Sequence, residues 1–283
     1  METLQFISIA CAVGVFIFLF IKYKKHVFFS SLISFLAIVI FMATIYLYGT
    51  HRTYSEKAEE APQNGQGAKL SEQRDTLELI KIENKVLLDA PVIKQFPELP
   101  RGCEVTALAM LLGSAGVEVD KMTLAKEIKK DSTPRTVKNG EINFGNPHEG
   151  FVGNMYTFNE PGLGVYHEPI MELAQSYLPE KIVNLSEQSF DELKIPLSDG
   201  RPVWVIINSQ YRELEDSYFQ IWNTKKGKIR ITMKEHSVLI TGYDEKFVYF
   251  NDPLTGLKNK KAPIEDFKKS WVQMGSQALT YSN

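Results

Sequence analysis

GCEVTALAMLL, residues 102–112, is a run of small and apolar residues with the pattern of a buried helix. The segment PELP, residues 97–100, precedes it and cannot be helical because of its two prolines. Gly113 and Gly116 follow the run and favour its end. The pattern therefore predicts one helix that begins at or beside Cys103.

Strand patterns dominate the sequence downstream of this helix. Short runs of β-branched and aromatic residues alternate there with turn residues, which is typical of strands. A helix near the start followed by consecutive strands predicts an α+β fold. The predicted strands are residues 202–208, a hairpin of 219–222 and 229–232 that turns near 225–228, and a hairpin of 236–243 and 246–252.

Two uncharged apolar stretches occupy the N-terminal fifty residues, at 4–21 and 27–48. A helix needs about 20 apolar residues to cross roughly 30 Å of hydrocarbon, so both stretches predict transmembrane helices. A secretory signal peptide fits poorly, because no basic segment precedes the first stretch and no small-residue cleavage site follows the second. Three lysines in the loop of residues 22–26 favour the cytoplasmic side for that loop. We therefore expect a multi-pass cell-membrane protein whose later residues face the extracellular side.

The chain beyond the membrane divides into a spacer and one domain. Residues 51–83 are rich in Glu, Gln, Ala, Lys and Gly, a composition that buries too little apolar area to fold, and they predict a flexible extracellular linker. Residues 84–283 have the length of one globular domain. The net charge of −2 gives no support for a nucleic-acid partner.

Cys103 is the candidate nucleophile. The other cysteine, Cys11, falls in the first apolar stretch, so Cys103 is the only thiol in the exported part of the sequence. A buried, inert cysteine is the simplest alternative. The predicted place at a helix start favours a reactive thiol, because the free N–H groups and the positive helix end lower a thiol pKa.

A thiol hydrolase also needs a base, a group that orients the base, and donors for the oxyanion. His236 opens an apolar strand, whereas His148 and His167 sit in Gly- and Pro-rich segments where packing roles are more common. A hairpin turn centred near Asp244 would place Asp252 directly opposite His236 on one face of the sheet. Gln95, together with the backbone N–H of Cys103, is the candidate oxyanion donor.

The combined motifs resemble the C39-like cysteine peptidases of Gram-positive bacteria. The resemblance rests on Gln95 with LPRGCE at 99–104, on EHSVLITGY at 235–243, and on NDP at 251–253. It implies a papain-like fold, with Cys103 as nucleophile, His236 as base, Asp252 as its orienting group and Gln95 as oxyanion donor. The peptidases that remove double-glycine leaders carry Asp-Cys-Gly where this chain has Gly-Cys-Glu, so leader processing is not expected here.

These observations predict a surface thiol hydrolase that cleaves a peptide or isopeptide bond. An amidase acting on peptidoglycan stem peptides is the alternative within the enzyme class, and a catalytically inactive peptide-binding module is the alternative outside it. Paired cysteines and closely spaced histidines are absent from the sequence, as are phosphate-loop and dinucleotide motifs, so no metal or cofactor is expected.

Overall fold

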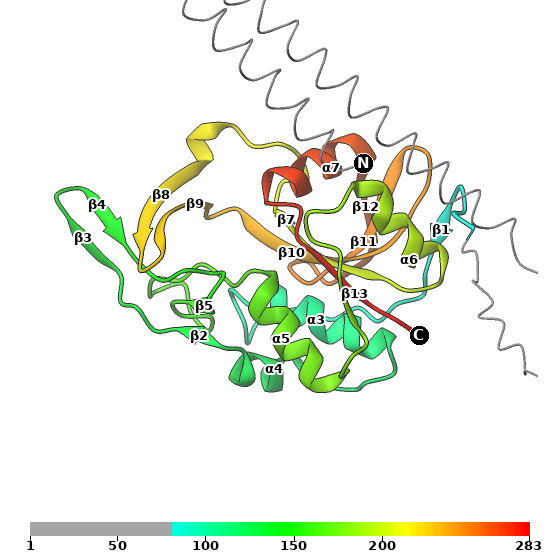
Figure 1. Cartoon of the computed structure of the whole chain (residues 1–283), viewed down its shortest axis with the longest axis horizontal. Coiled ribbons are helices and arrows are strands. Elements are labelled where there is room, and N and C mark those ends of the chain that lie inside the picture. The colour runs from blue at the N-terminus through cyan, green and yellow to red at the C-terminus, as the bar shows by residue number, and fades with distance from the viewer. Residues whose placement is uncertain (1–80) are drawn as a thin grey trace, which may run out of the picture. The chain divides into compact units, whose positions relative to one another are not determined.

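The computed structural model describes residues 81–283 (Figure 1). Both predicted transmembrane stretches, 4–21 and 27–48, lie outside the described residues, as does the predicted linker up to residue 80. No helix in residues 81–283 combines the length and the apolar character that a membrane span requires. The described residues belong to one compact unit, and the predicted domain boundary at residue 84 stays a prediction.

An antiparallel sheet of seven strands forms the centre of this unit. Its strand order is β12-β11-β10-β7-β13-β6, and β1 pairs with the far end of β10. The strands are β1 (Val86–Leu87), β6 (Ile182–Asn184), β7 (Val203–Asn208), β10 (Glu235–Tyr243), β11 (Phe247–Asp252), β12 (Leu257–Pro263) and β13 (Ala278–Tyr281). β10 has nine residues and is longer than β7. One edge of β10 therefore pairs with β7 along residues 235–240 and with β1 at residues 242–243.

Helices cover both faces of the sheet. They are α3 (Cys103–Ser114), α4 (Lys121–Glu127), α5 (His167–Tyr177), α6 (Lys194–Ser198) and α7 (Ile264–Gln273), with 3₁₀ turns at η1 (Phe190–Leu193) and η2 (Asp216–Tyr218). In Figure 1, α3, α4 and α5 lie on one side of the sheet and α7 lies on the other. Side chains that alternate along β10 separate the two cores: Leu239 packs with α3, whereas Val238 and Ile240 pack with α6 and α7.

Two smaller sheets complete the unit. A four-stranded sheet joins β3 (Thr136–Lys138), β4 (Glu141–Asn143), β8 (Phe219–Thr224) and β9 (Gly227–Thr232), and a parallel pair joins β2 (Lys130–Asp131) to β5 (Phe151–Val152). The four-stranded sheet extends away from the central sheet (Figure 1).

The sequence-based elements are confirmed within a few residues. The predicted helix at 102–112 is α3, and the predicted strands correspond to β7, to the hairpin of β8 and β9, and to the hairpin of β10 and β11. The α+β class, with the helix that carries Cys103 packed on an antiparallel sheet, is confirmed as well. The strands of residues 130–152 were not predicted, because they are only two or three residues long and show no periodicity.

Candidate active site

Cys103 is the first residue of α3, and the residues around it hold this end of the helix in place. Gly102 is required for close packing, since a Cβ atom there would lie 2.6 Å from Cβ of Leu99. The indole Nε1 of Trp204 on β7 donates a hydrogen bond of 3.0 Å to the carbonyl oxygen of Glu104. Ten consecutive residues of α3 are buried, and each large apolar side chain among them contributes about 1.5–3 kcal/mol by its burial. The thiol therefore sits on a rigid support.

The thiol itself has an acidic environment. Sγ of Cys103 lies 3.3 Å from Oε2 of Glu104, the next residue of the helix. Burial, followed by the neighbouring carboxylates of Glu104 and Glu235, raises the pKa of the Cys103 thiol well above its usual value. The expectation that the helix start lowers this pKa is therefore wrong for the resting site, because burial and two acidic neighbours outweigh the helix end.

His236 and Asp252 form a buried pair at the end of β10 and β11. Nε2 of His236 lies 2.9 Å from Oδ1 of Asp252, and both side chains are almost completely buried. Oδ2 of the same carboxylate accepts hydrogen bonds from the hydroxyl of Tyr211 at 3.0 Å and from Nζ of Lys260 at 2.9 Å. Burial opposes ionisation of Asp252, but its hydrogen bonds to His236, Lys260 and Thr255 hold its pKa well below the usual range. Asp252 is therefore a carboxylate near neutral pH.

The contact between these two residues arises from a strand register that differs from the predicted one. Direct opposition of His236 and Asp252 is wrong: Leu239 pairs with Asn251, so continuation of the ladder would place Asp252 opposite Val238. The register shifts between Ile240 and Gly242, where β10 has one extra residue. Without this bulge, Asp252 would fall opposite Leu239 and face the other side of the sheet. The pair is diagonal, and the bulge brings both side chains to the same face.

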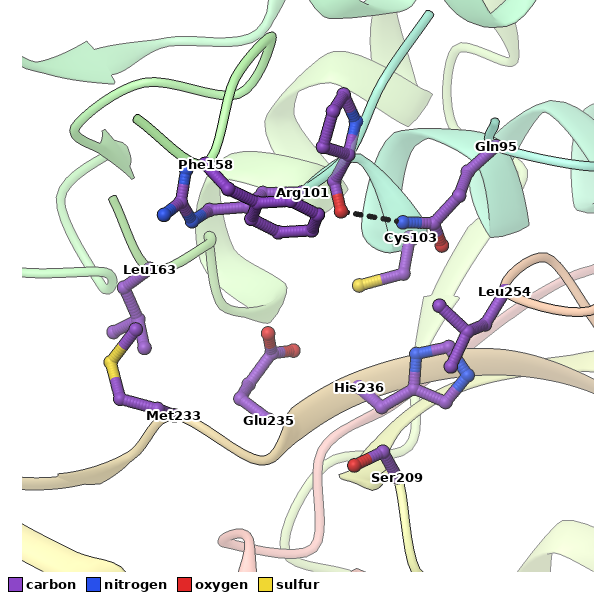
Figure 2. A pocket seen from close by; sticks show the side chains of 11 residues that line it. Gln95, Arg101, Cys103, Phe158, Leu163, Ser209, Met233, Glu235, His236 and Leu254 are labelled. Atoms are coloured by element: carbon purple, nitrogen blue, oxygen red, sulfur yellow. Dashed lines mark hydrogen bonds between the residues drawn. The ribbon is translucent and has the colours of Figure 1, made fainter. Parts of the chain in front are cut away.

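Cys103 and His236 line the same cavity, which we call the thiol pocket. Its volume is about 320 Å³, and its walls include Gln95, Arg101 and Glu235. Because Nε2 of His236 is bound to Asp252, Nδ1 is the ring nitrogen that can serve the thiol. Figure 2 shows the sulfur of Cys103 and the His236 ring facing the pocket from α3 and β10. In the described residues, the hydrogen bond of the thiol goes to Glu104.

Gln95 lies at the pocket wall, as predicted, but its amide is already engaged. Nε2 donates to the carbonyl oxygen of Leu99 at 3.2 Å and to that of Pro100 at 2.9 Å; the second bond is the dashed line in Figure 2. Its side-chain oxygen Oε1 is buried without a hydrogen-bond partner in the described residues. An amide carries two N–H groups, so one can keep a carbonyl while the other meets a substrate oxygen.

The other two histidines of the described residues lie elsewhere. His148 and His167 line a second cavity of about 400 Å³ that does not include Cys103. Nδ1 of His148 contacts Glu168 at 2.7 Å, and Nδ1 of His167 contacts Oε1 of Gln277 at 3.1 Å. These contacts agree with the packing roles that the sequence favours for both residues.

Four residues near the site were not identified from the sequence. Tyr211 and Lys260 come from distant segments and reach Asp252 only through the tertiary fold. Glu104 and Glu235 had a readable signal, since each is an acid directly beside a candidate catalytic residue at the edge of an apolar run. Sγ of Cys103 and one oxygen from each of these two acids lie within 4.8 Å of one another, a spacing that could hold a cation.

Cys103 at a helix start and His236 on the adjoining sheet line one pocket, and Asp252 contacts the His236 ring. This arrangement is typical of cysteine-peptidase folds. The comparisons with known proteins agree with this class. The model of the Peptidase C39-like family matches residues 87–279, and the chain belongs to that family.

Two relatives are similar over most of the domain. YvpB of Bacillus subtilis, an uncharacterised protein, is 46% identical over 183 residues, which cover 65% of this chain and 70% of YvpB. The crystal structure of a candidate C39-like peptidase from Bacillus anthracis is 48% identical with a TM-score of 0.66, and the match covers 71% of this chain and 98% of that one.

Proposed function

We propose that this protein is a membrane-anchored thiol hydrolase that cleaves a peptide or isopeptide bond on the outer surface of the cell. The observation that carries the proposal is the buried contact of 2.9 Å between His236 and Asp252 at the pocket that also contains Cys103. An inert core cysteine has no need of an oriented imidazole at the same pocket. Membership of the C39-like peptidase family supports a peptide substrate.

The chemistry follows from the positions of the groups. Nδ1 of His236 takes the proton from Sγ of Cys103, and the thiolate attacks the carbonyl carbon of the scissile bond. Asp252 stabilises the imidazolium that this transfer creates. The backbone N–H of Cys103, which has no partner within the helix at this position, and an amide N–H of Gln95 stabilise the oxyanion.

The two halves of the reaction use the same base. The tetrahedral intermediate collapses when the imidazolium of His236 gives its proton to the leaving amine, which leaves a thioester on Cys103. A water molecule, deprotonated by His236, then hydrolyses the thioester and restores the thiol. The order of Cys, His and Asp along the chain, and the helix packed on a sheet, support a papain-like arrangement for these steps.

Alkylation of the full-length chain with iodoacetamide tests the enzyme proposal. We expect alkylation of Cys103 near neutral pH to depend on His236, so that His236→Ala slows it, because the imidazole takes the proton of a thiol whose pKa is raised by burial. The matched control is His148→Ala, because His148 lies in the second cavity. A rate of alkylation that His236→Ala leaves unchanged would refute the proposed function.

The membrane anchor is tested separately. Apolar stretches at 4–21 and 27–48 support it, and the lysine-rich loop between them supports an extracellular domain. Protease treatment of intact cells should release the domain into the medium. A domain that becomes sensitive only after the cells are broken would place it on the cytoplasmic side.

A further inference from the structure

Glu104 is buried and Glu235 is half-buried with one buried carboxyl oxygen; both flank the thiol pocket, and we call them the acid pair. Glu104 directly follows Cys103 on α3, and Glu235 directly precedes His236 on β10. One oxygen from each acid and Sγ of Cys103 lie within 4.8 Å of one another. In Figure 2, the carboxyl group of Glu235 points from β10 toward the sulfur. The proposed reaction therefore takes place beside two acids that it does not use.

The fold makes room for the acid pair at a single glycine. A Cβ atom on Gly164 would lie 2.1 Å from Oε1 of Glu104 and 2.8 Å from Oε2 of Glu235. The next residue, Val165, donates its backbone N–H to Oε1 of Glu104 at 2.7 Å. Glu104 is thus held by hydrogen bonds, whereas Oε1 of Glu235 is buried without a partner among the described residues.

No basic side chain of residues 81–283 forms an ion pair with either member of the acid pair. Arg101 also lines the pocket, but its guanidinium donates to the carbonyl oxygens of Asn154 and Thr157 and lies over the ring of Phe158. Burial raises the pKa of Glu104 to about 7, and burial together with the charge of Glu104 raises the pKa of Glu235 well above its usual value. Without a ligand, a proton compensates the buried charge.

A second unpartnered acceptor faces the same pocket. Gln95 is 2% exposed, and its Oε1 has no hydrogen-bond partner in the described part of the chain. Gln95 and Glu235 thus each bring a buried oxygen without a donor to one pocket, and a ligand with N–H donors and positive charge suits this lining.

We propose that the acid pair forms a subsite for a protonated amine of the substrate, either a lysine-type side chain or a free amino group next to the scissile bond. The inference rests on the proposed function and names the substrate class. A divalent metal ion suits the site less well, because it would take Sγ of Cys103 as a ligand and block the nucleophile. Glu235 contacts the ammonium group, and Glu104 adds charge from behind.

Such a ligand also affects the nucleophile. In their charged forms, Glu104 and Glu235 disfavour the thiolate of Cys103. An ammonium group neutralises them and removes this electrostatic cost, so the correct substrate promotes ionisation of the thiol. Cationic substrates should therefore gain in kcat as well as in binding.

The test compares two thiol reagents on the full-length chain. Cationic 2-aminoethyl methanethiosulfonate and neutral propyl methanethiosulfonate both form a mixed disulfide with Cys103 and release methanesulfinate. We measure the ratio of their rate constants at pH 8 and divide it by the ratio for free 2-mercaptoethanol. The wild type should favour the cationic reagent by roughly tenfold or more, since hydrogen bonds to charged groups contribute about 1.5–3 kcal/mol.

Glu235→Gln should bring this ratio close to one, and the exposed control Glu213→Gln should keep the wild-type value. Circular dichroism checks that each variant is folded. If Glu235→Gln does not fold, the wild type still provides the test, because its preference for the cationic reagent should decline as the pH falls and the acid pair takes up protons. A wild-type ratio near one, or a preference that Glu235→Gln leaves intact, overturns the inference.

Two further outcomes separate this inference from its alternatives. A thiol whose reactivity depends on His236 but shows no cation preference overturns the amine subsite and leaves the proposed function standing. If the reactivity of Cys103 does not depend on His236, the proposed function is overturned. The protein could instead show no cation preference and lose labelling of Cys103 at micromolar Zn²⁺, with labelling restored by EDTA. That result would indicate a metal ion as the ligand of the acid pair and would overturn the proposal.

Discussion

The substitution Asp252→Asn tests the His–Asp pair with the smallest change in shape. It keeps an oxygen within reach of Nε2 of His236 but removes the negative charge. The side chains of His236 and Asp252 are 3% and 0% exposed, so water cannot replace the lost interaction. Lys260, whose side chain is 25% exposed, can turn its ammonium group toward solvent. The variant should therefore fold.

The size of the effect follows from the type of hydrogen bond. A hydrogen bond to a charged group contributes about 1.5–3 kcal/mol, and about 1.4 kcal/mol corresponds to a tenfold change. The thiolate–imidazolium form of Cys103 and His236 depends on this bond, because Asp252 is the carboxylate that contacts the imidazole. We therefore expect the rate of alkylation by iodoacetamide at pH 7 to fall by roughly ten- to hundredfold.

The assay follows alkylation of the full-length chain by mass spectrometry across pH 5–9. Asp266→Asn is the matched control, because it makes the same change of charge at an exposed position on α7. Thermal unfolding verifies that both variants retain the fold. If folded Asp252→Asn reacts as fast as the wild type throughout this range, the carboxylate has no part in activating the thiol and the reasoning is refuted.

Three further predictions concern other parts of the site. Gln95→Ala should lower kcat on a peptide substrate by roughly a hundredfold with little change in KM, if Gln95 donates to the oxyanion; an equal loss through KM alone would contradict this role. Gly164→Ala should lower the free energy of unfolding by about 1–3 kcal/mol because its Cβ would clash with Glu104; an unchanged urea midpoint would contradict it. Burial raises the pKa of Glu104 to about 7, so its folded form retains a proton that the unfolded chain has lost. The contribution of Glu104 to stability is present below its unfolded pKa and decreases as the pH rises through about 7. The melting temperature of the wild type should therefore fall between pH 5 and pH 8 relative to that of Glu104→Gln. Parallel curves of melting temperature against pH for the two proteins would contradict this prediction.

Local patterns were sufficient for the elements that carry the candidate site. The helix at Cys103 follows from the two prolines before it and the apolar run after it, and the strands of His236 and Asp252 follow from their β-branched and aromatic residues. The residues that signal each of these elements lie within or beside that element, so the local sequence is enough to predict it. The expectation that a helix start would lower the thiol pKa failed, because it considered one local contribution and omitted burial.

Residue types and short-range spacing by themselves determined the α+β class, the start of α3 and the identity of the candidate nucleophile, base and orienting carboxylate. Only the tertiary structure decided how these groups meet. The bulge in β10 sets which face Asp252 occupies, and packing around Gly164 brings Glu104 and Glu235 to the same thiol. Both depend on contacts between residues far apart in the chain. The electrostatic state of Cys103 depends on burial by those contacts, and no local pattern encodes it.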